Sequence, residues 1–150
     1  TGRSEQPDQT EGLHSLITTP LIIGDHVYGV GSYGELRGLD ARTGERLWVS
    51  EQMTTQARWG AAFLVQHDDR YFVNNDDGDL IIAQFTPDGY VELDRTRLID
   101  ADGSSGALVR GRPARFERAI NWTHPAYANK HIVHRNNTEI IRASLDADDY

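Results

Sequence analysis

LDARTGERLW, residues 39–48, places a tight turn between two short apolar segments. The Asp40 side chain can accept hydrogen bonds from backbone N–H groups two or three residues further on, which favours a turn. Gly44 tolerates the positive φ that such turns require. Trp48 presents a large flat surface to whatever packs beside it. We therefore interpret Asp40, Thr43, Gly44 and Trp48 as a packing device between neighbouring structural units and not as catalytic groups.

This turn belongs to the first of three copies of an internal repeat. The copies pair Asp25–Val30 with Gly34–Leu39, Asp69–Asn74 with Gly78–Ala83, and Lys130–His134 with Thr138–Ala143. Aligned in this way, Tyr28, Phe72 and Ile132 share one position, and Leu36, Leu80 and Ile140 share another. We expect the residues at each shared position to have equivalent environments.

Each copy consists of short apolar runs joined by turn residues, and no stretch has the 3.6-residue period of a long helix. Four strands in about 40–45 residues is the repeat length of a β-propeller blade. The sequence predicts an all-β fold, a partial β-propeller of about three four-stranded antiparallel blades. The expected ranges are a loosely attached segment at 1–12, a propeller portion at 13–150, blades at 16–51, 59–99 and 121–146, and an insertion loop at 100–118.

Three blades are too few to form a ring, because propellers close with about four to eight. The third copy also stops near Leu145 before a fourth strand. We therefore expect this chain to be part of a larger assembly whose partners are the remaining blades or another protein. An open blade edge exposes backbone donors and apolar surface, so the isolated chain should be marginally stable or self-associating.

The pattern Asp-x-x-Thr-Gly-x-x-x-Trp in residues 40–48 resembles the tryptophan-docking motif of PQQ-like (quinoprotein alcohol dehydrogenase-like) propellers. Further similarity to the closing blades of such proteins lies in residues 13–21, 33–37, 78–81 and 122–129. The resemblance implies an exported bacterial protein, periplasmic or extracellular, although no signal peptide is visible. Quinoprotein dehydrogenases of this superfamily hold a calcium ion and an Asp base beside the quinone, but no segment here matches those motifs. We expect no cofactor on this chain alone, and PQQ with calcium only if the missing blades supply the site.

Composition excludes several kinds of partner. Fifteen Lys and Arg against 23 Asp and Glu give a formal net charge of −8, which disfavours binding to nucleic acids and to anionic membrane surfaces. No apolar run approaches the roughly 20 residues needed to span a bilayer. The chain has no cysteine, so disulfides and thiolate metal sites are absent from it.

Three groups of side chains are candidates for a functional site. His124 lies on the segment equivalent to the innermost strand of a blade, where an imidazole could act as a base or metal ligand. Asp76, Asp77 and Asp79, with Asp68 and Asp69 nearby, could bind calcium, although Asp-Asp-Gly is also an ordinary hairpin turn. Arg110, Arg112 and Arg115 lie in the insertion with Arg118 and could meet an anionic ligand or acidic partner.

These features leave three functional hypotheses open. The leading one is a non-catalytic binding or scaffolding surface within an exported PQQ-like propeller. The alternative is the C-terminal part of a PQQ-dependent dehydrogenase, an oxidoreductase whose cofactor site lies largely outside this chain. A third hypothesis is a hydrolase or lyase that uses the face around His124. Enzymatic activity is therefore undecided from the sequence, with a non-enzymatic role favoured.

Overall fold

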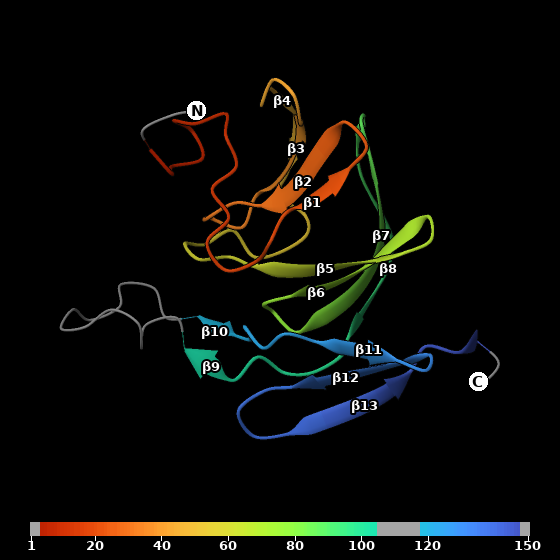
Figure 1. Cartoon of the computed structure of the whole chain (residues 1–150). Coiled ribbons are helices and arrows are strands. Elements are labelled where there is room, and N and C mark those ends of the chain that lie inside the picture. Colours follow the sequence, from red (N-terminus) through yellow and green to blue (C-terminus); the bar gives the residue numbers. More distant parts are fainter. Residues whose placement is uncertain (1–3, 105–117, 148–150) are drawn as a thin grey trace.

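A computed structural model describes residues 4–104 and 118–147. Within these residues the regular structure is β, arranged as three antiparallel sheets one beside another and a two-stranded ribbon (Figure 1). No helix in the described part is long and apolar enough to cross a membrane. The predicted partial β-propeller built from four-stranded blades is confirmed.

Blade 1 is a four-stranded sheet in simple meander order. Its strands are β1 (Leu21–Ile23), β2 (His26–Val30), β3 (Leu36–Asp40) and β4 (Arg46–Ser50). Gly24 has a φ of 57° in the turn between β1 and β2, and Gly44 has a φ of 74° between β3 and β4. A left-handed conformation is nearly free of strain for glycine, so these residues allow the tight turns.

Blade 2 repeats this order with longer strands. They are β5 (Ala62–His67), β6 (Arg70–Asn75), β7 (Asp79–Thr86) and β8 (Gly89–Arg97). Gly78, with a φ of 97°, permits the turn between β6 and β7. A β-bulge at Ile82/Ala83 shifts the register between β7 and β8, as one at Gly38/Leu39 does in blade 1.

Blade 3 has three strands in the described part of the chain. They are β11 (Ala126–Ala128), β12 (His131–Arg135) and β13 (Ile140–Ser144). The ribbon of β9 (Gly103–Ser104) and β10 (Ala119–Ile120) occupies both ends of the predicted insertion. The sheets of the three blades span residues 21–50, 62–97 and 126–144, and the predicted domain and blade limits remain predictions.

The core lies between blades 1 and 2. Its buried residues, from both sheets and the segment that joins them, are Val30, Leu36, Met53, Ala62, Tyr71, Val73, Ile81 and Ala83. Phe85 packs against this cluster, with ring centroids 5.5 Å from Tyr28 and 4.7 Å from Tyr71. Alternating apolar residues of β6 and β7 are thus buried against blade 1, as a stacked-repeat fold requires.

Blades 2 and 3 meet through a smaller set of contacts. Tyr127 of β11 stacks on Phe72 of β6 at a centroid distance of 5.3 Å, and its hydroxyl donates to Asn74 Oδ1. Ile132 is fully buried, and it pairs directly with Tyr127 across β11 and β12. Directly paired residues point to the same face of a sheet, so Ile132 points toward blade 2.

The predicted equivalence of Ile132 with Tyr28 and Phe72 is wrong by one position. Tyr28 and Phe72 each point toward the following blade, whereas Ile132 points back toward the preceding one. Between the last paired residues of the second and third strands lie five residues in blade 1 (31–35, between Val30 and Leu36) and five in blade 2 (75–79, between Asn74 and Leu80). Blade 3 has only four there, 136–139, between Arg135 and Ile140. One missing turn residue shifts the register and exchanges the two faces of β12, so Val133 is the true equivalent.

The other aligned set keeps its position. Leu36, Leu80 and Ile140 pair with Val30, Asn74 and Arg135, and all lie on the face directed away from the preceding blade. Leu36 and Leu80 are buried by the following blade, whereas Ile140 is 70% exposed. The three positions are therefore equivalent in the sheet but differ in whether another blade covers them.

The expected loose attachment of residues 1–12 does not describe residues 7–12. Fully buried Arg37 donates from Nη1 to the carbonyl oxygens of Thr10 and Gly12, each at 2.7 Å, and from Nη2 to that of Pro7 at 3.1 Å. Burial lowers the pKa of Arg37, while Glu35, 3.3 Å away, supplies the opposing charge. A buried guanidinium requires such acceptors, and the N-terminal segment provides them.

Candidate functional site

The acidic turn of blade 2 begins with Asp76, which is 1% exposed. Its Oδ1 accepts a hydrogen bond from Thr54 Oγ1 at 2.7 Å, and its Oδ2 accepts one from Ala61 N at 3.0 Å. Arg118 forms an ion pair with the same carboxylate. Burial raises the pKa of Asp76, and the hydrogen bond and charge of Arg118 oppose this rise.

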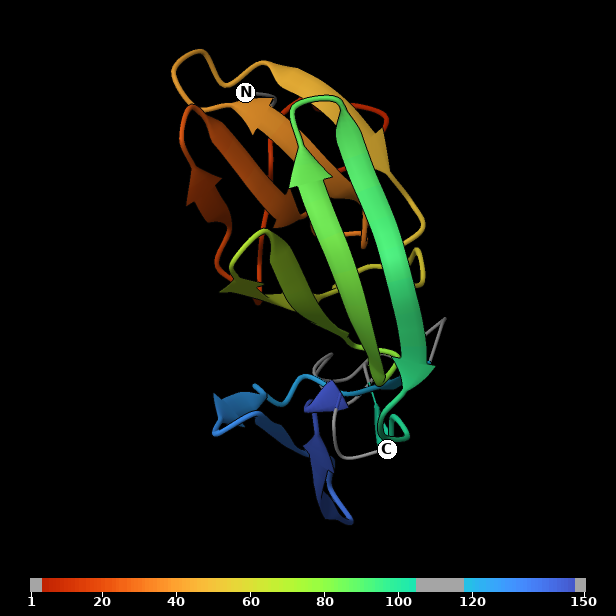
Figure 2. The same ribbon diagram turned by 90° about the vertical axis from the view of Figure 1, so that its right-hand side faces the viewer.

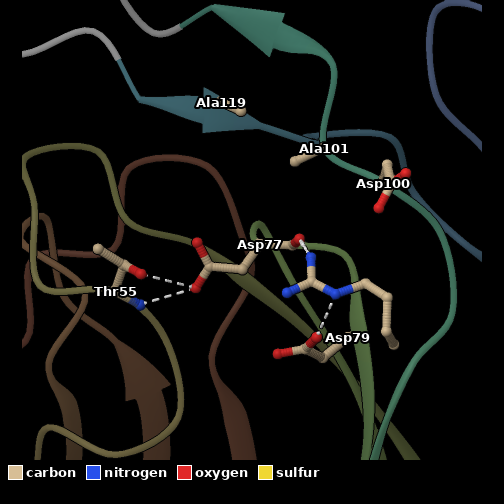
Figure 3. A pocket seen from close by; sticks show the side chains of 7 residues that line it. Thr55, Asp77, Asp79, Asp100, Ala101 and Ala119 are labelled. Atoms are coloured by element: carbon tan, nitrogen blue, oxygen red, sulfur yellow. Dashed lines mark hydrogen bonds and ion pairs between the residues drawn. The ribbon is translucent and has the colours of Figure 1, made fainter.

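The two other carboxylates of this turn are also held by protein groups (Figure 3). Asp77 accepts hydrogen bonds from the Thr55 backbone and hydroxyl at 2.9 and 3.0 Å, and pairs with Arg118. Asp79 lies 3.0 Å from both Arg95 Nη1 and Arg97 Nε. At Asp76, Asp77 and Asp79, the predicted calcium ligands, the positive charge beside each carboxylate therefore comes from arginine side chains.

Asp68 and Asp69 lie apart from this network, at the turn between β5 and β6 at the other end of β6. Within the described residues no three acidic, His or Cys side chains converge in a way that could hold a metal ion. The five aspartates that are close in the sequence therefore lie at opposite ends of β6, with Asp68 and Asp69 at one end and Asp76, Asp77 and Asp79 at the other.

A polar cavity of about 550 Å³ opens beside the acidic turn. It is lined by Thr55, Asp77, Asp79, Arg97, Asp100, Ala101 and Ala119. The cavity lies between the end of blade 2 and the chain that leads to blade 3. Arg118 contributes to this region as described above, whereas Arg110, Arg112 and Arg115 fall outside the described residues.

A second, smaller pocket lies where the first strands of the three blades begin. Figure 2 shows β1, β5 and β11 along the same side of the molecule, the side that faces the axis in a propeller. The pocket has a volume of about 190 Å³ and is lined by residues 17–21, Phe63, Leu64 and His124. We call it the axial pocket.

His124 is exposed and precedes β11. Its ring lies 4.7 Å from that of Phe63, and its Nδ1 is 2.8 Å from the Pro125 carbonyl oxygen. No carboxylate of the described chain is hydrogen-bonded to it, so the orienting acid of a catalytic dyad is not among its contacts. The structure places His124 at a pocket and leaves its catalytic role a hypothesis.

The predicted packing motif makes contacts between blades 1 and 2. Asp40 Oδ1 accepts hydrogen bonds from the backbone N–H groups of Arg42 and Thr43, at 2.9 and 2.8 Å, which lowers the pKa of Asp40. Trp48 stacks on Tyr28 at 5.7 Å and donates from Nε1 to Thr86 O of blade 2 at 3.0 Å. In blade 2 the residue that pairs with Ile82, as Trp48 pairs with Gly38, is the exposed Asp94.

Sequence reasoning missed two asparagines that tie blades to the segments before them. Asn75 Nδ2 donates to Met53 O at 3.0 Å, and Asn136 Nδ2 donates to Asp100 O at 3.0 Å. Asn75 is the last residue of β6, and Asn136 directly follows β12. An alignment that allowed for the shorter turn of blade 3 would have placed them at one position.

Together, the repeated antiparallel sheets and the aromatic contacts between them define a partial β-propeller. Neither a protein-family model nor a curated protein sequence matches the chain. Among solved structures, the chain is similar to BamB from Moraxella catarrhalis, with a TM-score of 0.48 and 15% identity over 83% of this chain. It is also similar to quinohemoprotein alcohol dehydrogenase from Comamonas testosteroni, with a TM-score of 0.45 and 14% identity over 82% of this chain. The matches span 29% and 17% of those two chains.

Proposed function

We propose that this chain is a non-catalytic binding or scaffolding portion of a larger PQQ-like propeller, and that the outward face of blade 3 docks the next blade or a partner protein. We define this face as the side of β11, β12 and β13 directed away from blade 2. Its residues are Ala126, Ala128, Val133, Arg135, Ile140 and Arg142.

The observation that supports the proposal is that β13 forms an open sheet edge in the described chain. The third strands of the other blades, β3 and β7, are each paired with a fourth strand, β4 and β8. In the described chain β13 has no such neighbour, and Ile140 on it is 70% exposed. Complete burial of such a side chain contributes about 2 kcal/mol, so covering this face is favourable.

Charge on the same face indicates the chemistry of its partner. Arg135 and Arg142 are exposed, and neither forms an ion pair with a described carboxylate. Arg142 Nη2 instead lies 2.8 Å from His131 Nε2. A surface that presents carboxylates around an apolar centre complements this face.

Sedimentation velocity of the chain over a wide concentration range tests the docking face. We expect reversible self-association in the absence of the natural neighbour, and we expect Ile140→Lys to weaken it strongly. Val91→Lys is the matched control, because Val91 is a 46% exposed apolar residue on β8, away from this face. A monomer at every concentration, with a single sharp unfolding transition, would contradict the proposal.

Quinone binding separates this role from the dehydrogenase alternative. PQQ is a fused tricyclic tricarboxylate, whereas the axial pocket is about 190 Å³ and has no cationic Lys or Arg in its lining. The grouped carboxylates of blade 2 are held by arginines. These features support the expectation that a PQQ and calcium site would need residues from outside this chain.

Titration of the chain with PQQ and calcium, followed by calorimetry and dye reduction with alcohols and sugars, measures this directly. We expect no saturable quinone binding and no dye reduction. Saturable binding with the stoichiometry of one quinone per chain would favour the oxidoreductase over the scaffold.

We also propose that the protein is exported to the bacterial periplasm or cell exterior. The support is the similarity of residues 40–48 to a motif of proteins that are typically exported. Fractionation of cells that produce the full-length protein from its own gene tests it, and recovery with cytoplasmic markers would refute it.

A further inference from the structure

The axial pocket brings together residues from the starts of all three blades. Residues 17–21 lead into β1, Phe63 and Leu64 belong to β5, and His124 lies two residues before β11. Ile17 is 36% exposed and Phe63 is 8% exposed at this pocket. It is therefore an open hollow lined by aliphatic and aromatic side chains, by Thr18 and Thr19, and by one imidazole.

The contact of His124 with the Pro125 carbonyl oxygen is compatible with the neutral tautomer that carries its proton on Nδ1. The Pro125 carbonyl oxygen can only accept, so in this tautomer the neutral ring donates from Nδ1 across the 2.8 Å distance. Nε2 is then an acceptor with a free lone pair, and it has no hydrogen-bond partner among the described residues. An exposed acceptor in this tautomer is available to a ligand that donates one hydrogen bond.

The side chains that line the axial pocket indicate what kind of group the remainder of the ligand has. The tilted contact between Phe63 and His124, with centroids 4.7 Å apart, offers aromatic surface, and Leu21 and Leu64 offer aliphatic surface. A cavity of about 150 Å³ lined by apolar residues holds benzene. The volume of about 190 Å³ therefore suits one six-membered ring with a small substituent.

We propose that the axial pocket binds a small neutral phenol, with its ring against Phe63 and its O–H donating to Nε2 of His124. This site is separate from the outward face of blade 3 and does not depend on the docking role. Apolar walls with a few placed polar groups, here His124 with Thr18 and Thr19, are the usual composition of a small-molecule site.

Titration of the isotope-labelled chain with phenol and with anisole tests the proposal, because anisole keeps the ring and oxygen but lacks the O–H. We expect saturable amide shifts at residues 17–21, 63 and 64, and a change in the nitrogen shift of His124 Nε2 with phenol. Phenol should bind roughly fivefold more tightly than anisole, which is the contribution of one neutral hydrogen bond.

His124→Phe keeps an aromatic ring at this position and removes the acceptor, so the preference for phenol over anisole should fall to about one. His67→Phe is the matched control, because His67 also stacks on a phenylalanine, Phe72 at 5.3 Å, but lies outside the pocket. That variant should keep the full preference. Shifts that do not saturate, shifts spread over the surface, or equal affinities of the two probes in the unmodified chain would overturn the proposal.

Discussion

At the scale of single residues, one position at the end of the second strand ties each blade to the preceding connection. Asn75 and Asn136 do this in blades 2 and 3. Blade 1 has Gly31 there, and the Glu35 carboxylate fills the space that a larger side chain would need. Arg37, paired with Glu35, then binds the carbonyl groups of the N-terminal segment. One structural requirement is thus met by different residue types.

Asn136→Ala should destabilise the chain by about 2–3 kcal/mol. Asn136 is 5% exposed, and its Oδ1 accepts from the backbone of Thr138 and Glu139 while Nδ2 donates to Asp100 O. Removal of a buried side chain leaves these groups unpaired, each at a cost of about 1–3 kcal/mol when water cannot replace it. Urea unfolding measures the change. Asn137→Ala, at an exposed neighbour, should change stability by less than about 0.5 kcal/mol; equal effects would refute the assignment.

His134 should make stability depend on pH. Burial lowers the pKa of His134 from its ordinary 6.5, and the backbone bond to Thr123 and the charge of His124 modify it less. Below pH 6.5 the unfolded chain takes up a proton that the folded chain resists. The contribution of His134 is therefore fully present above pH 6.5 and is lost as the pH falls through the lower folded pKa.

His134→Gln cannot titrate in this range, so it should reduce the loss of stability between pH 7 and 5. Urea unfolding at several pH values measures the difference in slope. His67→Gln, at an exposed histidine of blade 2, should leave the slope unchanged. If His134→Gln and the unmodified chain have the same pH profile, burial of a neutral His134 is not the cause.

At the scale of strands, the side chain of Trp48 links β4 to blade 2. Trp48 lies over Gly38 of the adjacent strand β3, where an added Cβ would overlap the indole ring. The same indole donates to Thr86 O at the end of β7. The pairing of a glycine with a tryptophan therefore sets how closely β3, β4 and blade 2 approach.

Gly38→Ala should cost about 1–3 kcal/mol, because it forces the indole away from a closely packed position. The fluorescence of Trp48 should shift, and urea unfolding should show the loss of stability. In a Trp48→Phe background the smaller ring leaves room, so the same glycine substitution should cost clearly less. Additive effects of the two substitutions would show that Gly38 does not act through Trp48.

The strands and turns of this chain were predictable because their signals are local. Alternating apolar residues define strands such as His26–Val30, and Gly24 and Gly44 mark turns in the residues themselves. The register of β12 was not predictable in this way, because one residue missing from a turn leaves the strand pattern intact. The ion pairs of Asp79 were also not predictable from the sequence, because its partners Arg95 and Arg97 lie on another strand. The sequence shows the acidic cluster but not the cations that meet it.

At the scale of the whole molecule, Asp76 joins three parts of the chain. Its side chain binds Thr54 and Ala61 from the connection between blades 1 and 2. Arg118, before blade 3, pairs with the same carboxylate, and Asn121 N donates to the Asp76 carbonyl at 2.7 Å. A single turn of blade 2 therefore holds the chain that enters the blade and the chain that leaves it.

Asp76→Asn should loosen both blade interfaces together. The asparagine amide cannot accept hydrogen bonds from Thr54, Ala61 and Arg118 at once, because its NH₂ group is a donor like the guanidinium. We therefore expect the free energy of unfolding to fall by about 3 kcal/mol, as when one partner of a buried ion pair is removed. Hydrogen exchange should accelerate at Ala61 and at Asn121, on opposite sides of blade 2. Asp77→Asn removes a partly exposed contact to Thr55 and Arg118, so its effect should be about 1 kcal/mol or less and confined to that turn. Faster exchange on only one side of blade 2 in Asp76→Asn would mean that the blades are coupled through their packed faces alone, without this turn.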